Sequence, residues 1–442
     1  MSKRGFTLIE LMVAMVVGLA TITSVYSLGS AMSKQFYQEQ RVATSQGASR
    51  VALMELRRDI SRAGLFGTPN AAKEASCDGT NPRLPAYGGG NLPLAAFQFY
   101  PDADLSVLDP DGVNTTVRAD RLRILTSLYL TDQLLVESTS ADGQTIVLNS
   151  GTQAYRRTFA WGQAATPITS GATPDYLAGT LDWDSAWGGE TTSWKGIAQK
   201  GARAFQTGSV LHIESPSGRH FFRKVFNKSG NTQGQIRLQV GPAKLPVGSA
   251  CLPGAAESSQ IAPLQWVEYA IVDPFDTAEV GADFFDFEGM FFIDLDPTNP
   301  SFNLKDTVAS DLIESPNRVL VRRVLDATTG NVKVNTTQII AEFVTHFSVG
   351  FLRDTNSGNP AAAPVLEFWG KGDESTINSN PEDIRSVIIE LGVRTPLEDP
   401  NLPFIADAGT TRFEVDKDQY GSARMRIMRI EVPVMNVARR NL

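Results

Sequence analysis

The sequence GFTLIELMVAMVVGLATITSVYSLGSAMS occupies residues 5–33 and contains a single charged side chain, Glu10. Lys3 and Arg4 precede it, and no proline occurs within it. The 28 residues of 6–33 would form a helix about 42 Å long, which exceeds the roughly 30 Å hydrocarbon core of a bilayer. This stretch therefore predicts a membrane-spanning helix. The basic residues before it predict that its N-terminus stays in the cytoplasm.

Glu10 distinguishes this stretch from two common kinds of N-terminal segment. A cleaved secretory signal peptide has an apolar core of about 7–15 residues and a small-x-small cleavage site; the run here is longer and is acidic near its start. A plain signal anchor does not require a carboxylate. A carboxylate inside a membrane costs on the order of 3 kcal/mol and usually marks a functional contact. The best interpretation is therefore one that gives Glu10 a partner.

The hexapeptide GFTLIE at residues 5–10 resembles the class III signal of type IV pilins and of the pseudopilins of type II secretion. The resemblance implies that residues 1–5 are a leader peptide, which a prepilin peptidase removes between Gly5 and Phe6. It also implies that Phe6 is then N-methylated, and that Glu10 meets the N-terminal amine of a neighbouring subunit. The pairing is physically reasonable, because a carboxylate and an ammonium in hydrocarbon each need the other.

The helical pattern continues beyond the apolar run. We assign 6–33 to the transmembrane half of a long stem helix and 34–67 to its amphipathic half, with Gly64 and Gly67 as candidate stops. In the second half, apolar residues recur at spacings of three and four, which predicts one buried stripe with charged residues on the other faces. The apolar stripe consists of Leu53, Leu56, Ile60 and Ala63, and the charged residues are Arg57, Arg58, Asp59 and Arg62.

The remaining residues, 68–442, have the pattern of a β-rich head. Turn-like stretches alternate with short segments such as RLRIL at 121–125, whose alternation is typical of half-buried antiparallel strands. One long helix followed by such a head is an α+β architecture. We expect strands at 97–100, 120–130, 145–148, 209–215, 219–226, 235–240, 266–272, 318–325, 339–352, 384–395 and 424–435.

Residues 158–200 form an irregular stretch that contains four of the chain's six tryptophans. We interpret it as an insertion in the head, or as a boundary between two β subdomains near residue 200. The tryptophans either pack back onto the head, the commoner fate of apolar side chains, or lie exposed and bind a partner.

Other segments resemble particular minor subunits. RRDISRAGLFG at 57–67 is similar to the end of the stem in PilW-type minor pilins. Three C-terminal segments resemble the terminal strands of PilW-like and type II secretion J-type minor subunits, in which an Arg-rich last strand runs into Arg-Asn, here Arg440 and Asn441. These segments are EFVTHFSVGFL (342–352), IRSVIIELGVRT (384–395) and RMRIMRIEVPVMNVARRNL (424–442).

Two groups of residues outside the stem could serve a structural or metal-binding role. Cys77 and Cys251 lie in turn-like segments, and in a periplasmic head a disulfide is their natural interpretation, with two free thiols as the alternative. An acidic run at 273–297 offers oxygen ligands for Ca²⁺, but it has no EF-hand spacing, and a solvated strand face is the favoured interpretation. The Ca²⁺ candidates are Asp283, Asp286, Glu288, Asp294 and Asp296.

The sequence provides no argument for an enzyme. It has no His-Glu-x-x-His, Gly-x-Ser-x-Gly or P-loop motif, and His212, His220 and His346 stand isolated in strand-like segments. We therefore expect no catalytic residue and no cofactor. The net charge of −8 argues against nucleic acid as a partner.

The resemblance as a whole implies a pilin-like fold and a structural role as a minor type IV pilin. Before assembly, the processed stem would reside in the lipid of the inner membrane with its head in the periplasm. The chain would then join other minor pilins and the major pilin, on an inner-membrane assembly platform, in a tip complex that primes polymerisation. The alternatives are a tip adhesin or ligand-binding pilin, and a minor pseudopilin of type II secretion.

Overall fold

The computed structural model describes most of the stem and of the strands in the head. The described ranges are 8–71, 94–109, 117–128, 132–155, 209–230, 236–241, 257–273, 318–326, 336–356, 363–396, 412–414 and 421–438, with short runs and single positions between them.

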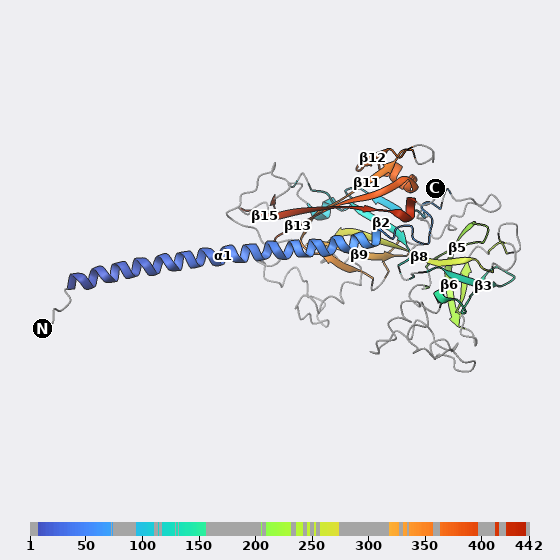
Figure 1. The fold of residues 1–442 in the computed structure, drawn as a ribbon, viewed down its shortest axis with the longest axis horizontal. Helices are drawn as coiled ribbons and strands as arrows, with labels where there is room; N and C mark the ends of the chain where they lie inside the picture. The colour runs from blue at the N-terminus through green and yellow to red at the C-terminus, as the bar shows by residue number, and fades with distance from the viewer. Residues whose placement is uncertain are drawn as a thin grey trace, which may run out of the picture.

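One long helix, α1 (Leu8–Ile60), begins the described chain. Its 53 residues correspond to about 80 Å, and Figure 1 shows a long N-terminal part of it projecting from the head. The expectation of a continuous helix through the apolar run and into the amphipathic half is confirmed. Regular helix stops at Ile60, and the chain continues as turns.

The first sheet of the head has five antiparallel strands in the order β1-β2-β8-β9-β10. These strands are β1 (Phe97–Tyr100), β2 (Arg121–Thr126), β8 (Gln260–Val272), β9 (Val319–Leu325) and β10 (Gln338–Ala341). Only the second half of β8 belongs to this sheet, because its pairing with β2 and β9 starts at Gln265 and Trp266.

The first half of β8 belongs to a closed ring of strands in the order β8-β3-β4-β7-β6-β5. The ring closes because Gln260 lies opposite Leu135 on one side and Glu214 on the other. A closed ring has no free strand edges, and this one encloses a separate apolar cluster. Its other strands are β3 (Leu134–Thr139), β4 (Thr145–Leu148), β5 (Val210–Glu214), β6 (His220–Gly230) and β7 (Ile236–Gly241).

A second sheet has the order β12-β11-β13-β15-β14, and all its pairings are antiparallel. Its strands are β11 (Val344–Asp354), β12 (Leu366–Trp369), β13 (Ile384–Arg394), β14 (Arg412–Phe413) and β15 (Ala423–Pro433). The three C-terminal segments expected to be terminal strands therefore lie side by side as β11, β13 and β15. The short helices of the described chain are α2 (Leu105–Leu108), α8 (Glu374–Ser379), η3 (Pro381–Asp383) and α9 (Met435–Ala438).

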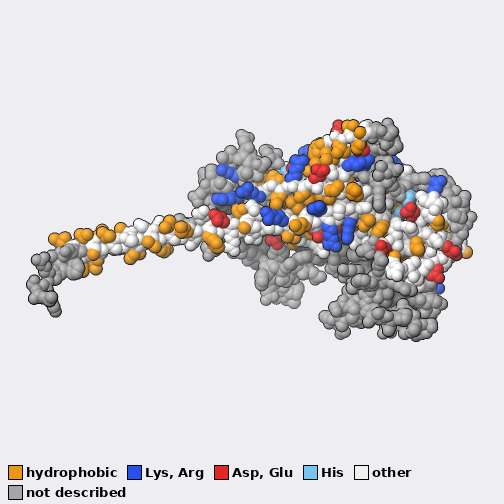
Figure 2. Space-filling view, in the orientation of Figure 1, with side chains coloured by type: hydrophobic (Ala, Val, Ile, Leu, Met, Phe, Trp, Pro, Cys, Tyr) orange, Lys and Arg blue, Asp and Glu red, His pale blue; other side chains and the backbone are white. Residues whose placement is uncertain are grey.

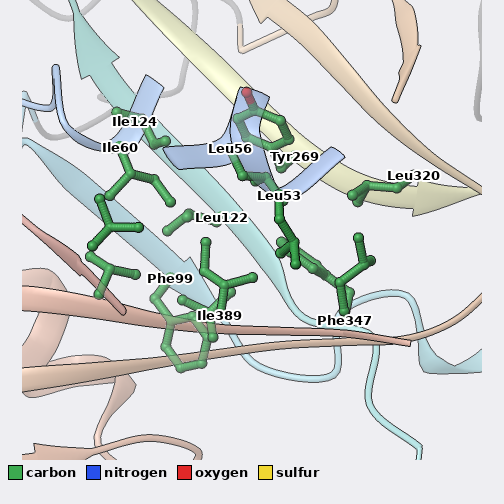
Figure 3. Packing of buried hydrophobic residues seen from close by; sticks show 14 of the residues in the cluster. Leu53, Leu56, Ile60, Phe99, Leu122, Ile124, Tyr269, Leu320, Phe347 and Ile389 are labelled. Carbon is green, nitrogen blue, oxygen red and sulfur yellow. The ribbon is translucent and has the colours of Figure 1, made fainter. Parts of the chain in front are cut away.

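The main core of the head forms around the last turns of α1, which pack against both sheets. One cluster joins the apolar stripe of the stem to Tyr269 and Leu320 of the first sheet and to Phe347 and Ile389 of the second (Figure 3). Leu56 and Ile60 have no exposed surface. The buried stripe expected from the helical spacing is therefore confirmed. It consists of Ala52, Leu53, Leu56, Ile60 and Ala63.

The α+β architecture with antiparallel strands is also confirmed, and the departures from the expected strands have physical causes. The single strand expected at 339–352 is wrong, because Phe343 has a φ of 54° and separates β10 from β11. β8 starts earlier than expected, since its first half is buried on both faces and shows no alternation. The sequence does not predict β3, in which a register shift disrupts the alternation, nor the short strands β12 and β14.

We predict that Leu56→Ala lowers the free energy of unfolding of the head by about 2–5 kcal/mol, because it leaves a cavity between the two sheets. Met54→Ala, two residues away at a side chain that is 71% exposed, should change it by less than about 0.5 kcal/mol. Guanidinium unfolding of the full chain in detergent, followed by tryptophan fluorescence, measures both. Equal effects would mean that the stem is not held between the sheets.

Candidate functional site

The N-terminal part of α1 exposes its apolar side chains to the surroundings. The segment Leu11–Ser30 is long and apolar enough to cross a membrane, and none of its 20 residues is buried against the rest of the chain. Figure 2 shows hydrophobic side chains along this part of the stem. Exposed apolar surface of this extent is unfavourable in water and needs a lipid or protein environment.

Three hydroxyl side chains within this segment are satisfied by the helix itself. The hydroxyls of Thr21, Thr23 and Ser24 each donate to the carbonyl oxygen four residues earlier, at 2.8 Å. An unsatisfied hydroxyl would be costly in hydrocarbon, so these back-bonds make the segment compatible with a membrane interior.

Gly5 and Phe6, the residues expected at the cleavage site, lie outside the described residues. Glu10, which is expected to direct assembly, lies in the first turn of α1. Several other expectations also fall outside the described residues. They concern the cysteine pair Cys77 and Cys251, the segment 158–200, Arg440 with Asn441, and the five Ca²⁺ candidates in 273–297. Among the residues that the structure does describe, no three His, Cys, Asp or Glu side chains come together as a metal site.

A buried carboxylate attaches the stem to the first sheet. Asp59 is only 2% exposed, and its Oδ2 accepts hydrogen bonds from the Tyr269 hydroxyl at 2.9 Å and from Arg322 Nε at 2.6 Å. The expectation that Asp59 lies on an exposed charged face of the stem is therefore wrong. A signal was present, because Asp59 follows Leu56 by three residues and precedes Ala63 by four, which places it within the apolar stripe.

The protonation states at this attachment follow from burial and from the ion pair. Burial, and then the neighbouring Asp59 carboxylate, raise the pKa of Tyr269 well above its usual value, so the hydroxyl stays a donor. Burial acts to lower the pKa of Arg322, but the Asp59 carboxylate outweighs it and the pKa is raised. The result is a fixed salt bridge between the stem and β9 with a tyrosine hydrogen bond from β8.

The end of the stem is capped by other parts of the head. Gly64 has a φ of 70°, a conformation that favours glycine at a helix end, and its N–H donates to Leu125 O at 2.9 Å. Thr126 Oγ1 donates to Arg62 O at 2.7 Å, and Asn436 Nδ2 donates to Ser61 O at 2.9 Å. The interpretation of Gly64 as the stop is confirmed by this geometry.

Two histidines connect the turn after the stem to the ring of strands. His212 Nδ1 lies 2.7 Å from Phe66 O, and its Nε2 lies 2.8 Å from His220 Nδ1. Because Phe66 O can only accept, His212 donates through Nδ1, and His220 donates to His212 Nε2. The expectation that these histidines are isolated is wrong: they meet across the β5–β6 pair and their rings stack.

Burial, and then the neighbouring His220, lower the pKa of His212 to about 3. Burial also lowers the pKa of His220. The third histidine, His346 on β11, is buried elsewhere; its Nδ1 accepts from Arg118 N at 3.2 Å, and burial lowers its pKa. All three are therefore neutral structural groups at neutral pH.

A second buried charge group lies on the face of the first sheet that points away from the stem. Glu268 of β8 lies between Arg123 of β2 and Arg323 of β9 in the strand register. Arg123 Nε donates to it at 2.6 Å and Arg323 Nε at 2.7 Å. Burial acts to raise the pKa of Glu268, but the arginines lower it overall. This group holds three neighbouring strands together.

Comparison with known proteins identifies the N-terminus. A family model, the prokaryotic N-terminal methylation motif, matches residues 1–26. No curated protein and no solved structure matches the chain. The match supports a type IV pilin-like family. It indicates that the chain is a substrate for processing of the type IV pilin or pseudopilin kind. It implies processing by a prepilin peptidase and assembly with other pilins, and with the apolar helix it is consistent with membrane anchoring.

We predict that Asp59→Asn lowers the free energy of unfolding by about 3–5 kcal/mol, because it leaves the Arg322 charge buried without its partner. Tyr269→Phe removes only one hydrogen bond to a charged group and should cost about 1.5–3 kcal/mol. Glu55→Gln, which affects a partly exposed pair with Arg58, should cost less than about 1 kcal/mol. Denaturant unfolding of the three full-length variants ranks their losses in free energy of unfolding. An Asp59→Asn variant as stable as the original chain would contradict the role assigned to Asp59.

We predict that stability falls as the pH is lowered from about 6.5 towards 3. In this range the unfolded chain protonates His212 and the folded chain does not, so His212 contributes a slope of at most about 1.4 kcal/mol per pH unit. Asn at this position keeps an N–H donor but cannot titrate, so His212→Asn should have a shallower dependence. Urea unfolding at several pH values measures the pH dependence of the free energy of unfolding. The same slope in the original chain and in His212→Asn would show that His212 is not buried as a neutral group.

Proposed function

We propose that this chain is a PilW-like minor type IV pilin, a structural subunit of a tip complex that initiates pilus assembly. The observation that carries the proposal is that the two ends of one helix have different surroundings. Its N-terminal part bears the methylation motif and an unburied apolar segment, while its last turns are buried between two sheets. This is the arrangement expected of a subunit that packs through its stem and presents its head.

In this proposal the stem resides in the inner membrane before assembly, with the head in the periplasm. A prepilin peptidase removes residues 1–5, and the Phe6 amine and the Glu10 carboxylate direct the docking of neighbouring stems. The head is attached to α1 through a buried salt bridge and a capped helix end. Docking of the stem therefore sets the position of the head among other minor pilins.

The role is structural and needs no cofactor. Two buried carboxylates among the described residues, Asp59 and Glu268, are each paired with arginine, which is a structural use of charge. We expect a disulfide between Cys77 and Cys251 in the oxidising periplasm.

We predict that the chain recovered from membranes begins at N-methylated Phe6 only when the prepilin peptidase is present. Intact mass and N-terminal sequencing measure this, with and without the peptidase. Gly5→Val should leave the chain starting at Met1, because it replaces the small residue at the cleavage site. Ser2→Ala, a matched change within the leader, should be processed normally.

Cells that produce the chain and its peptidase also test whether it is a minor subunit of the filament. Sheared filaments should contain the processed chain at a small fraction of the copy number of the major subunit, and loss of the chain should reduce the number of filaments. A start at Met1 or beyond residue 25 in the presence of the peptidase would contradict the pilin assignment. Processing without any effect on filaments would contradict the priming role.

A further inference from the structure

The buried stripe of the stem has an exposed counterpart on the opposite side of the same turns. The outer stripe consists of Arg50, Val51, Met54, Arg57 and Arg58, whose spacings of three and four place them on one helix face. Val51 is 66% and Met54 71% exposed, and the Arg58 side chain is 61% exposed. The outer stripe is thus an apolar centre with three arginines around it.

Among the described residues, the neighbours of the outer stripe leave it basic. On the helix itself, Glu55 is the acidic residue beside the stripe, partly exposed and 3.8 Å from Arg58. On the β15 side, Arg426 is exposed and lies opposite Val393, a core residue, so it is on the face of β15 that packs on the stem. Arg322 of β9 is already neutralised by Asp59. Figure 2 shows Lys and Arg side chains gathered over this part of the head, although the whole chain has a net charge of −8.

We propose that the outer stripe docks an amphipathic helix of a different subunit, one that presents acidic side chains around an apolar centre. The inference rests on the proposed assembly of stems and adds the chemistry of the partner. Val51 and Met54 supply apolar contact, and the arginines select an acidic partner by charge complementarity. The outer stripe lies on the same helix as the unburied apolar segment Leu11–Ser30, and Arg50 follows the end of that segment by 20 residues. A partner stem that lies beside that segment and extends further along α1 therefore reaches the outer stripe.

Two other occupants fit the geometry poorly. A second copy of this chain would bring three arginines against three arginines, which is repulsive and disfavours self-association. A lipid surface is too far away. Arg50 follows Ser30, the end of the apolar segment, by 20 residues, which is about 30 Å along a helix, whereas the Debye length at physiological salt is about 8 Å.

The direct test uses the full chain in a neutral detergent and two synthetic helical peptides. The peptides share the same apolar residues and carry either Glu or Lys at the flanking positions. Fluorescence anisotropy should show at least tenfold tighter binding of the Glu peptide, and this binding should weaken as salt is added. The triple variant Arg50→Glu/Arg57→Glu/Arg58→Glu should reverse the preference. Arg237→Glu, at an exposed arginine of β7, should leave it unchanged.

Equal binding of the two peptides, or an unchanged preference in the triple variant, would overturn the proposal. All changed side chains are exposed, so circular dichroism should show native structure in each variant.

A second test in cells keeps the failure of this inference separate from that of the proposed function. A photoreactive amino acid at position 54 should cross-link the full chain to the stem of another subunit, and the triple variant should abolish the cross-link. Cross-linking to a second copy or to lipid would overturn the inference. Normal processing at Phe6 with no effect of the triple variant on filaments would leave the proposed function standing, whereas failed processing would remove both.

Discussion

The salt bridge between Asp59 and Arg322 is the contact on which the geometry of the whole molecule depends. A buried carboxylate needs a partner of opposite charge in good geometry, so Asp59 restricts how α1 can rotate and slide between the two sheets. A rotation of the helix by one residue would bring Arg58 into the core and Asp59 out of reach of Arg322. The apolar stripe supplies the attraction between stem and head, and the salt bridge with the Tyr269 hydrogen bond selects one arrangement.

The end of the helix strengthens this attachment through residues from distant parts of the chain. Gly64 bonds to the end of β2, Phe66 accepts from His212 of β5, and Ser61 accepts from Asn436 of α9. β8 then connects the parts of the head, because its first half completes the ring of strands and its second half lies under the stem. The stem and the head thus form a single mechanical unit. In the assembly that we propose, contacts made along the exposed stem are transmitted to the head.

Several features could be predicted because they depend on neighbours in sequence. The apolar segment, the buried stripe and the stop at Gly64 all follow from helical spacing and from backbone conformation. Strands β1 and β4 were predicted with their observed bounds, since their patterns are local. Asp59 was assigned to the wrong face although its spacing was informative, because an acidic residue in an apolar stripe is understood only when its partner is known. That partner, Arg322, lies 263 residues away.

The order of residues along the chain was enough to predict one long helix, its apolar first half, its resemblance to an N-terminal methylation motif and the α+β class, because each is a property of consecutive residues. The folded arrangement was needed to reveal the pairing of Asp59 with Arg322 and of His212 with His220. It was also needed to divide 339–352 between two sheets and to close the ring of strands at Gln260. These features depend on which strands become neighbours, and antiparallel pairing brings together residues whose separation in sequence carries no periodic signal.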